Sequence, residues 1–111
     1  MWIFMSDAML SIVQKSEDKE RGSLTVRARG PGEIESVFPE AQVIELRNCD
    51  YRFRAVIARE TVAKTVFSRL MTLEYDNFKN SIKDEDLESA CHDVWSIMFQ
   101  YQKDKHQRAQ D

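Results

Sequence analysis

The chain has 111 residues, of which 42% are hydrophobic and 32% are charged, and its formal net charge is −3 at pH 7. These values are typical of one soluble globular domain, and they exclude a disordered chain and a strongly basic nucleic-acid-binding protein. No apolar run approaches the length of a transmembrane helix, and the first residues lack the basic segment of a signal peptide. We therefore expect a cytoplasmic protein that does not bind a membrane.

The N-terminal third of the chain predicts three strands. Residues 2–5 and 8–14 are apolar runs separated by Ser6-Asp7, which favour a tight turn and a β-hairpin, with one long bulged strand as the alternative. Residues 15–22 contain no apolar side chain and predict a charged mobile loop. In residues 24–29, apolar side chains alternate with Thr and Arg, which is the period of a half-buried strand.

The next segment predicts a short helix and a strand. Gly30-Pro31-Gly32 ends the preceding strand, and residues 33–38 have apolar side chains at helical spacing, with acidic residues in the first turn. Residues 42–46 predict a strand whose Ile44 and Leu46 face inward.

The stretch that organises the chain comprises residues 50–59. Its apolar and polar side chains alternate, which predicts a strand with one face in the core. The inward residues are Tyr51, Phe53, Ala55 and Ile57, and the outward ones include Arg52 and Arg54. An amphipathic helix over residues 60–72 follows directly.

The C-terminal part predicts a polar loop over residues 73–81 and a last helix that begins near Asp84. This helix has a wide apolar stripe, formed by Leu87, Ala90, Cys91, Val94, Trp95, Met98 and Tyr101. Such a stripe is difficult to bury in a small domain, so one expectation is a homodimer contact through it. We expect a single domain over residues 1–105 and a frayed polar tail over residues 106–111.

Together these elements predict an α+β fold. The strands are short and joined mainly by hairpin-length connections, so we expect a mainly antiparallel sheet of four to five strands with helices packed on one face. The order strand-helix-strand-strand-helix within residues 23–72 makes a ferredoxin-like variant an alternative.

The motifs predict no catalytic residue, metal site or cofactor. Gly30-Pro31-Gly32 lacks the spacing and the lysine of a phosphate-binding loop. Cys91, His92 and Asp93 cannot form a catalytic triad by themselves, because consecutive helical residues point about 100° apart. Glu88 and His92 lack the further ligands of a metal site, and two cysteines are too few for a disulfide scaffold. We therefore expect a protein that is not an enzyme.

Arginine gives the strongest functional signal. Residues 21–59 carry seven arginines, no lysine and five acidic residues, so the segment has a net charge of +2. If the two predicted arginine strands are neighbours, four guanidinium groups share one open face of the sheet: Arg27, Arg29, Arg52 and Arg54. Such a face can bind carboxylates or phosphates, and therefore an acidic protein surface, RNA or DNA. The alternative is a solvated face whose arginines pair with Glu45 and other nearby acids.

A second candidate patch lies in the loop before the last helix and comprises Tyr75, Asn77, Phe78 and Lys79. We favour a packing role for its aromatic residues, which can attach the last helix to the core. A partner-binding loop is the alternative.

Five segments resemble a widespread group of small bacterial proteins that also occur on phages and plasmids. They are MWIFMSDAMLSIV at residues 1–13, LTVRAR at 24–29, DYRFRA at 50–55, YDNFK at 75–79 and DVWSIM at 93–98. The resemblance covers nearly the whole chain, and it implies a compact bacterial domain with a mobile-element connection. It brings no activity and no catalytic residues.

These observations predict a non-enzymatic protein-binding module whose arginine strands meet an acidic surface of a protein partner. In the phage or plasmid setting that the resemblance implies, this would be an inhibitor or modulator, such as an anti-CRISPR protein that masks a nucleic-acid groove. A nucleic-acid-binding module that uses the same arginines is the alternative. RNA-binding sheets usually carry exposed aromatic residues as well, and Tyr51 and Phe53 are assigned to the core, so this alternative is incomplete.

Overall fold

The computed structural model describes residues 1–110, which divide into two compact units. The first unit, Met1–Tyr75, is α+β, and the second, from Asp76 onward, is helical. The expectation of a single domain over residues 1–105 stays a prediction. The first unit contains the strands β1 (Trp2–Met5), β2 (Ala8–Val13), β3 (Ser23–Ala28), β4 (Ile44–Glu45) and β5 (Phe53–Ala58), with the helices α1 (Ser16–Arg21), α2 (Glu33–Val37) and α3 (Arg59–Met71).

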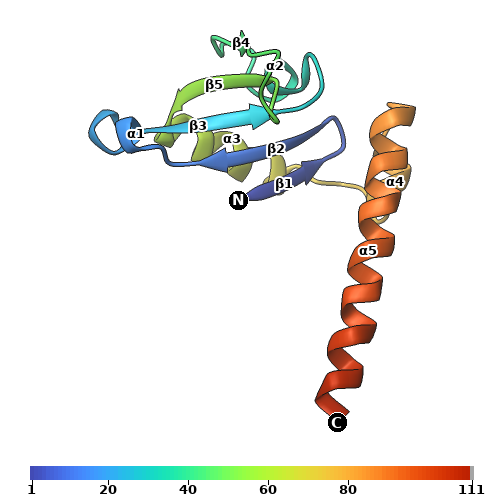
Figure 1. Cartoon of the computed structure of the whole chain (residues 1–111). Helices are drawn as coiled ribbons and strands as arrows, with labels where there is room; N and C mark the ends of the chain where they lie inside the picture. The colour runs from blue at the N-terminus through green and yellow to red at the C-terminus, as the bar shows by residue number, and fades with distance from the viewer. Residues whose placement is uncertain (111) are drawn as a thin grey trace. The chain divides into compact units, whose positions relative to one another are not determined.

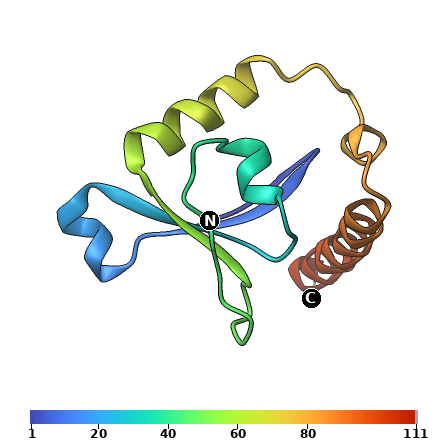
Figure 2. The ribbon, with the colours of Figure 1, turned by 90° about the horizontal axis from the view of Figure 1, so that it is seen from above.

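The five strands form one open sheet in the order β1-β2-β3-β5-β4, in which every neighbouring pair is antiparallel. Helices α2 and α3 lie on the same side of this sheet (Figures 1 and 2). The predicted α+β class is thus confirmed. Because β5 lies between β3 and β4, the connection through α2 spans a strand, as in the split β-α-β unit of ferredoxin-like folds.

The predicted N-terminal hairpin is confirmed. Met5 pairs with Ala8, which leaves Ser6 and Asp7 as a two-residue turn between β1 and β2. The predicted helix over residues 33–38 is α2, and the one over residues 60–72 is α3. The predictions therefore placed the elements well wherever apolar periodicity was clear.

The core lies between the sheet and helices α2 and α3. It is formed by buried side chains from every element except α1 and β4: Met5, Ala8, Leu10, Ile12, Val26, Ala28, Ile34, Val37, Phe38, Ala55, Ile57 and Val62. The inward placement predicted for Ile44 and Leu46 is wrong, because both side chains are exposed and Val43 packs against the core instead. Strand β4 has only two residues, which is too short for the alternation of inward and outward side chains to predict which residues are buried.

Residues 15–22, expected as a mobile loop, contain helix α1, and its Asp18 is only 2% exposed. The Asp18 carboxylate accepts hydrogen bonds from the Ser23 hydroxyl at 2.6 Å, the Thr25 hydroxyl at 2.9 Å and the Lys15 backbone N–H at 2.8 Å. Gly22, at φ 66°, ends the helix in the left-handed conformation that glycine adopts most readily. The prediction failed because a buried carboxylate, rather than an apolar side chain, holds α1 to β3.

An ion pair joins the first hairpin to α3. Arg69 lies 2.7 Å from one Asp7 carboxylate oxygen and 3.1 Å from the other, and it also donates to the Ser36 carbonyl at 3.0 Å. Although partial burial acts to raise the pKa of Asp7, the hydrogen bond and charge of Arg69 hold that pKa below its ordinary value of 3.8. The paired carboxylate therefore stabilises the fold above about pH 4, and this contribution is lost as the pH falls further.

Replacing Asp7 with asparagine is expected to lower the free energy of unfolding at pH 7 by less than about 1 kcal/mol, because both side chains of the pair are partly solvated. Urea denaturation at pH 7 and pH 3 checks this, and the difference from the wild type should shrink at pH 3. Glu20→Gln, which neutralises an exposed acid on α1, is the control. A loss of equal size at both pH values would contradict the electrostatic explanation.

The second unit consists of α4 (Phe78–Ser81) and α5 (Glu85–Gln110). The polar loop expected over residues 73–81 is wrong in its second half, because Asn77 caps α4 by accepting a hydrogen bond from the Asn80 backbone N–H at 3.0 Å. Helix α5 continues to Gln110, through most of the predicted tail, and Asp111 lies outside the described residues. Within residues 1–110, neither α5 nor any other helix is long and apolar enough to cross a membrane.

Candidate binding face of the sheet

The strand pairing on which the arginine prediction depended is present: β3 lies beside β5, and Arg27 is directly opposite Arg54. Directly opposite residues of antiparallel strands point to the same face. The register therefore places one row of side chains across all five strands, on the side away from the buried core residues. The row comprises Trp2, Ser11, Arg27, Arg54 and Ile44. We call this side, together with Arg29 and Tyr51, the arginine face.

Tyr51 organises the basic part of the arginine face. The guanidinium carbons of Arg27 and Arg29 lie 4.4 Å and 4.2 Å from the centroid of its ring. At these distances a cation is attracted by the electrons of the ring. Tyr51 is 4% exposed, yet it does not belong to the core cluster. The predicted burial of Tyr51 is therefore confirmed, but its ring packs against Arg27 and Arg29 rather than in the core cluster. Regular β5 begins only at Phe53, so the alternation does not reach Tyr51.

Arg27 and Arg54 are further fixed by hydrogen bonds. Arg27 donates to the Ser11 hydroxyl at 2.6 Å, and the Arg54 Nε donates to the carbonyl of Tyr51 at 3.3 Å. Arg54 also lies 3.5 Å from the Asp50 carboxylate. The Arg27 Nε is buried and has no hydrogen-bond partner among the described residues. A buried unpaired donor is costly, so an incoming acceptor that reached it would gain free energy.

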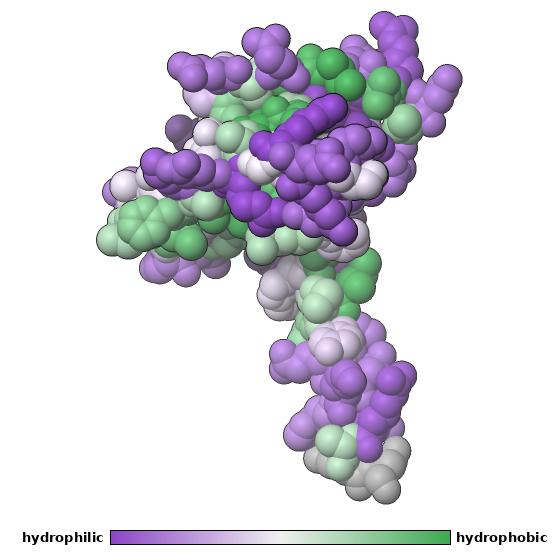
Figure 3. Space-filling view, turned by 90° about the vertical axis from the view of Figure 1, so that its left-hand side faces the viewer, coloured by the Kyte–Doolittle hydropathy of each residue, from purple (hydrophilic) through white to green (hydrophobic). Residues whose placement is uncertain are grey.

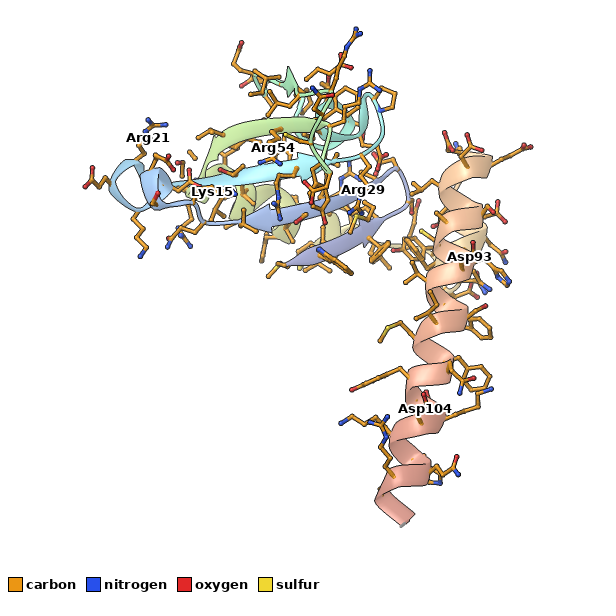
Figure 4. The ribbon with its side chains drawn as sticks, in the orientation of Figure 1. Lys15, Arg21, Arg29, Arg54, Asp93 and Asp104 are labelled. Carbon is orange, nitrogen blue, oxygen red and sulfur yellow. The ribbon has the colours of Figure 1, made fainter. Side chains whose placement is uncertain are left out.

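Arg52 makes a different set of contacts from the other three arginines. Its Nε donates to the Glu45 carboxylate at 2.6 Å, and Arg47 lies 3.8 Å from the same carboxylate. The predicted pairing of the arginines with nearby acids therefore applies to Arg52, through Glu45, and to Arg54, through Asp50. Within residues 1–110, no carboxylate lies within ion-pair distance of Arg27 or Arg29. The structure thus groups three of the four predicted arginines around Tyr51, and Figure 4 labels Arg29 and Arg54.

The arginine face also carries exposed apolar side chains that the sequence interpretation missed. Trp2 is 66% exposed, and it stands in the same row as Arg27 and Arg54. Ile44 and Val56 are exposed on the same face. The alternating run at residues 2–5 is too short to predict on which face of the sheet Trp2 lies. The pairing of Trp2 with Ser11 places it on the arginine face. The face therefore combines positive charge, one exposed aromatic ring and aliphatic surface.

The second predicted patch crosses the boundary between the two units in the sequence. Tyr75 belongs to the first unit, whereas Asn77, Phe78 and Lys79 belong to the second. Asn77 is used as a helix cap. The Lys79 ammonium lies 4.7 Å from the centroid of the Trp95 indole ring, and 3.4 Å from Nδ1 of His92. These contacts hold α4 on α5. The expected role of the aromatic residues, attachment of the last helix to the core, stays a prediction.

Across residues 1–110, no group of three His, Cys, Asp or Glu side chains could hold a metal ion. Cys49 is exposed and Cys91 is buried, and neither forms a disulfide within the described residues. A cavity of about 280 Å³ in the first unit lies between β1 and the end of α3, with a mainly apolar lining. Its lining includes Arg69, which is paired with Asp7.

No family model, no curated protein and no solved structure matches the chain. The resemblance to small bacterial proteins of phages and plasmids therefore stays a prediction. The case for a function rests on the arginine face.

Proposed function

We propose that the chain is a non-enzymatic protein-binding module that presents the arginine face to an acidic surface of another protein. The observation that carries the proposal is the position of Arg27 and Arg29 against the buried Tyr51 ring, with no carboxylate of the described chain at ion-pair distance. Guanidinium groups that are already held in place lose little entropy when a carboxylate binds them.

The composition of the arginine face also suits a protein partner. Trp, Tyr and Arg are the residues most enriched at the energetic centres of protein interfaces, and this face combines Trp2, Tyr51 and three arginines. Exposed Ile44 and Val56 add apolar surface that phosphates do not need. The net charge of −3 weakens attraction to nucleic acid over longer distances. The mobile-element inhibitor that the resemblance implies is a specific form of this function.

An affinity capture from a bacterial lysate tests the proposal. The double variant Arg27→Gln with Arg29→Glu is expected to lose a partner that the wild type retains, because it removes the two unneutralised guanidinium groups. Arg47→Glu with Lys64→Glu is the control, since it removes two exposed positive charges away from Tyr51. Circular dichroism should show the same fold for all three proteins. Capture that survives the first double variant would contradict the proposal.

Single-stranded nucleic acid is the second candidate, and Trp2 is the observation that favours it. An exposed indole ring in the same row as Arg27 and Arg54 can stack on a base while the arginines bind phosphates. Binding of a fluorescent RNA or DNA oligonucleotide, titrated at two salt concentrations, tests it. With three phosphate contacts, the logarithm of the binding constant should fall with the logarithm of salt at a slope of about −2. No binding at low salt would remove this candidate.

A further inference from the structure

Helix α5 carries an apolar strip that the rest of the second unit does not cover. The strip comprises Val94, Ile97, Met98 and Tyr101, and Ile97 is 68% exposed. These positions follow the spacing i, i+3, i+4 and i+7, so their side chains lie on one face of the helix. Leu87 and Ala90 continue the same face toward the N-terminal end.

The only other helix of the described second unit is too short to cover this strip. Helix α5 has 26 residues and is therefore about 39 Å long, whereas α4 has four. Helix α4 contacts the first half of α5, where Cys91 is buried and Lys79 lies over Trp95. Long helices in proteins owe most of their stability to packing of an apolar face, so a partner for the remaining strip is expected.

The charges of α5 are divided between its two halves. Residues 85–97 carry four acidic side chains and no lysine or arginine, for a net charge of −4. Residues 98–110 carry Lys103, Lys105 and Arg108 against Asp104, for a net charge of +2. Figure 4 labels Asp93 in the first half and Asp104 in the second, and Figure 3 shows hydrophilic residues toward the C-terminal end of the helix.

We propose that two copies of this chain associate through an antiparallel pairing of their α5 helices. A parallel pair would place like charges together. In an antiparallel pair centred near Val94, Leu87 of one copy faces Tyr101 of the other, so the two apolar strips meet, and Glu85 and Asp86 lie beside Lys103 of the other copy. The contact then has two-fold symmetry and closes with two copies.

The alternative docking surface for the strip is a set of exposed apolar residues on α3 of a second copy. Phe67, Leu70 and Met71 are exposed on that helix, which was predicted to be amphipathic. The region around them is not self-complementary in the way α5 is, since α3 has a net charge of +2 along its whole length. If a dimer depends on Leu70, the strip packs against α3 of the other copy rather than against its α5. The Leu70→Glu variant therefore distinguishes the two surfaces.

Sedimentation equilibrium of the full chain tests the proposal, and a dimer is expected. Ile97→Glu with Met98→Glu should raise the dimer dissociation constant at least about a hundredfold, because two charges would then be buried in an apolar contact. Ser89→Glu with Ser96→Glu, which adds the same charge on the opposite side of α5, should leave the dimer intact. A monomer at all concentrations, or a dimer that survives the first variant or is lost with Leu70→Glu, would overturn the proposal.

Charge reversal tests the orientation of the helices. Lys103→Glu with Lys105→Glu should weaken the dimer about tenfold or more, because acidic residues then face acidic residues in the antiparallel pair. Adding Glu85→Lys and Asp86→Lys to the same chain should restore it. In a parallel pair the fourfold variant would again place like charges together, so a dimer that is not restored would overturn the antiparallel arrangement. Circular dichroism reports whether α5 stays helical in each variant.

Discussion

Replacing Asp18 with alanine is expected to lower the free energy of unfolding by about 3–5 kcal/mol. The carboxylate is 2% exposed, and it accepts hydrogen bonds from two side-chain hydroxyls and one backbone N–H. Alanine would leave the Ser23 and Thr25 hydroxyls and the Lys15 N–H without their acceptor in a site that has little access to water. Each buried donor left unsatisfied costs about 1–3 kcal/mol.

Urea denaturation followed by circular dichroism measures this loss. Glu17→Ala is the matched control, since it removes a neighbouring carboxylate of α1 that is exposed, and it should change the stability by less than about 0.5 kcal/mol. Asn at position 18 retains one acceptor oxygen and should give an intermediate loss. If Asp18→Ala and Glu17→Ala had equal effects, the hydrogen bonds of Asp18 would not be holding α1 to β3.

The same carboxylate predicts how stability depends on pH. The hydrogen bond from Ser23, opposed by burial and supported by Lys15 and Thr25, holds the pKa of Asp18 below its ordinary value of 3.8. A lowered pKa means that Asp18 stabilises the fold at neutral pH, and that the contribution is lost as the pH falls through 4 toward the pKa of the folded state. The Asp18→Asn variant should therefore lose less stability between pH 5 and pH 3 than the wild type, in the same denaturation assay.

Replacing Tyr51 with alanine is expected to lower the free energy of unfolding by about 3 kcal/mol, because it removes a buried ring and the two guanidinium contacts it makes. The change should also weaken partner binding by at least about tenfold. Without the ring, Arg29 would have to be ordered when a partner binds, which costs about 1–2 kcal/mol for a long side chain, whereas Arg27 keeps its hydrogen bond to Ser11.

Tyr51→Phe is the matched control, since it keeps the ring and removes only the hydroxyl group. It should keep both the stability and the affinity close to those of the wild type. Denaturation gives the first quantity, and titration of the captured partner by calorimetry gives the second. A Tyr51→Phe variant as impaired as Tyr51→Ala would show that the hydroxyl, rather than the ring, positions the arginines.

The fold was predictable from the sequence where side chains alternate over a full strand. In β3 and β5 this alternation runs for six residues each, so it predicts correctly that Arg27 and Arg54 point away from the core. The pairing of β3 with β5 then places the two arginines on one face. Alternation failed where elements are short or irregular. Ile44 stands in a two-residue strand, and Tyr51 precedes the regular part of β5.

Helix α1 shows a different limit of sequence interpretation. A segment of charged residues normally predicts solvent exposure, and nothing in the composition of residues 15–22 distinguishes Asp18 from its acidic neighbours. Its burial depends on hydroxyl groups of β3 that come later in the chain. The available signal was the pattern of acids in the first turn, bases in the last turn and Gly22 at the end, which is typical of a short helix. The same signal gives no information about which carboxylate is buried.

The position of β5 between β3 and β4 has a consequence for recognition. Arg27 and Arg54 become neighbours only after the chain has passed through α2 and β4 and returned to the middle of the sheet. This pairing is long-range, so it closes late compared with the local hairpin of β1 and β2. No peptide cut from either strand carries the arginine face. A partner that reads both arginines together therefore recognises a conformational epitope, and it discriminates the folded protein from nascent or unfolded chains.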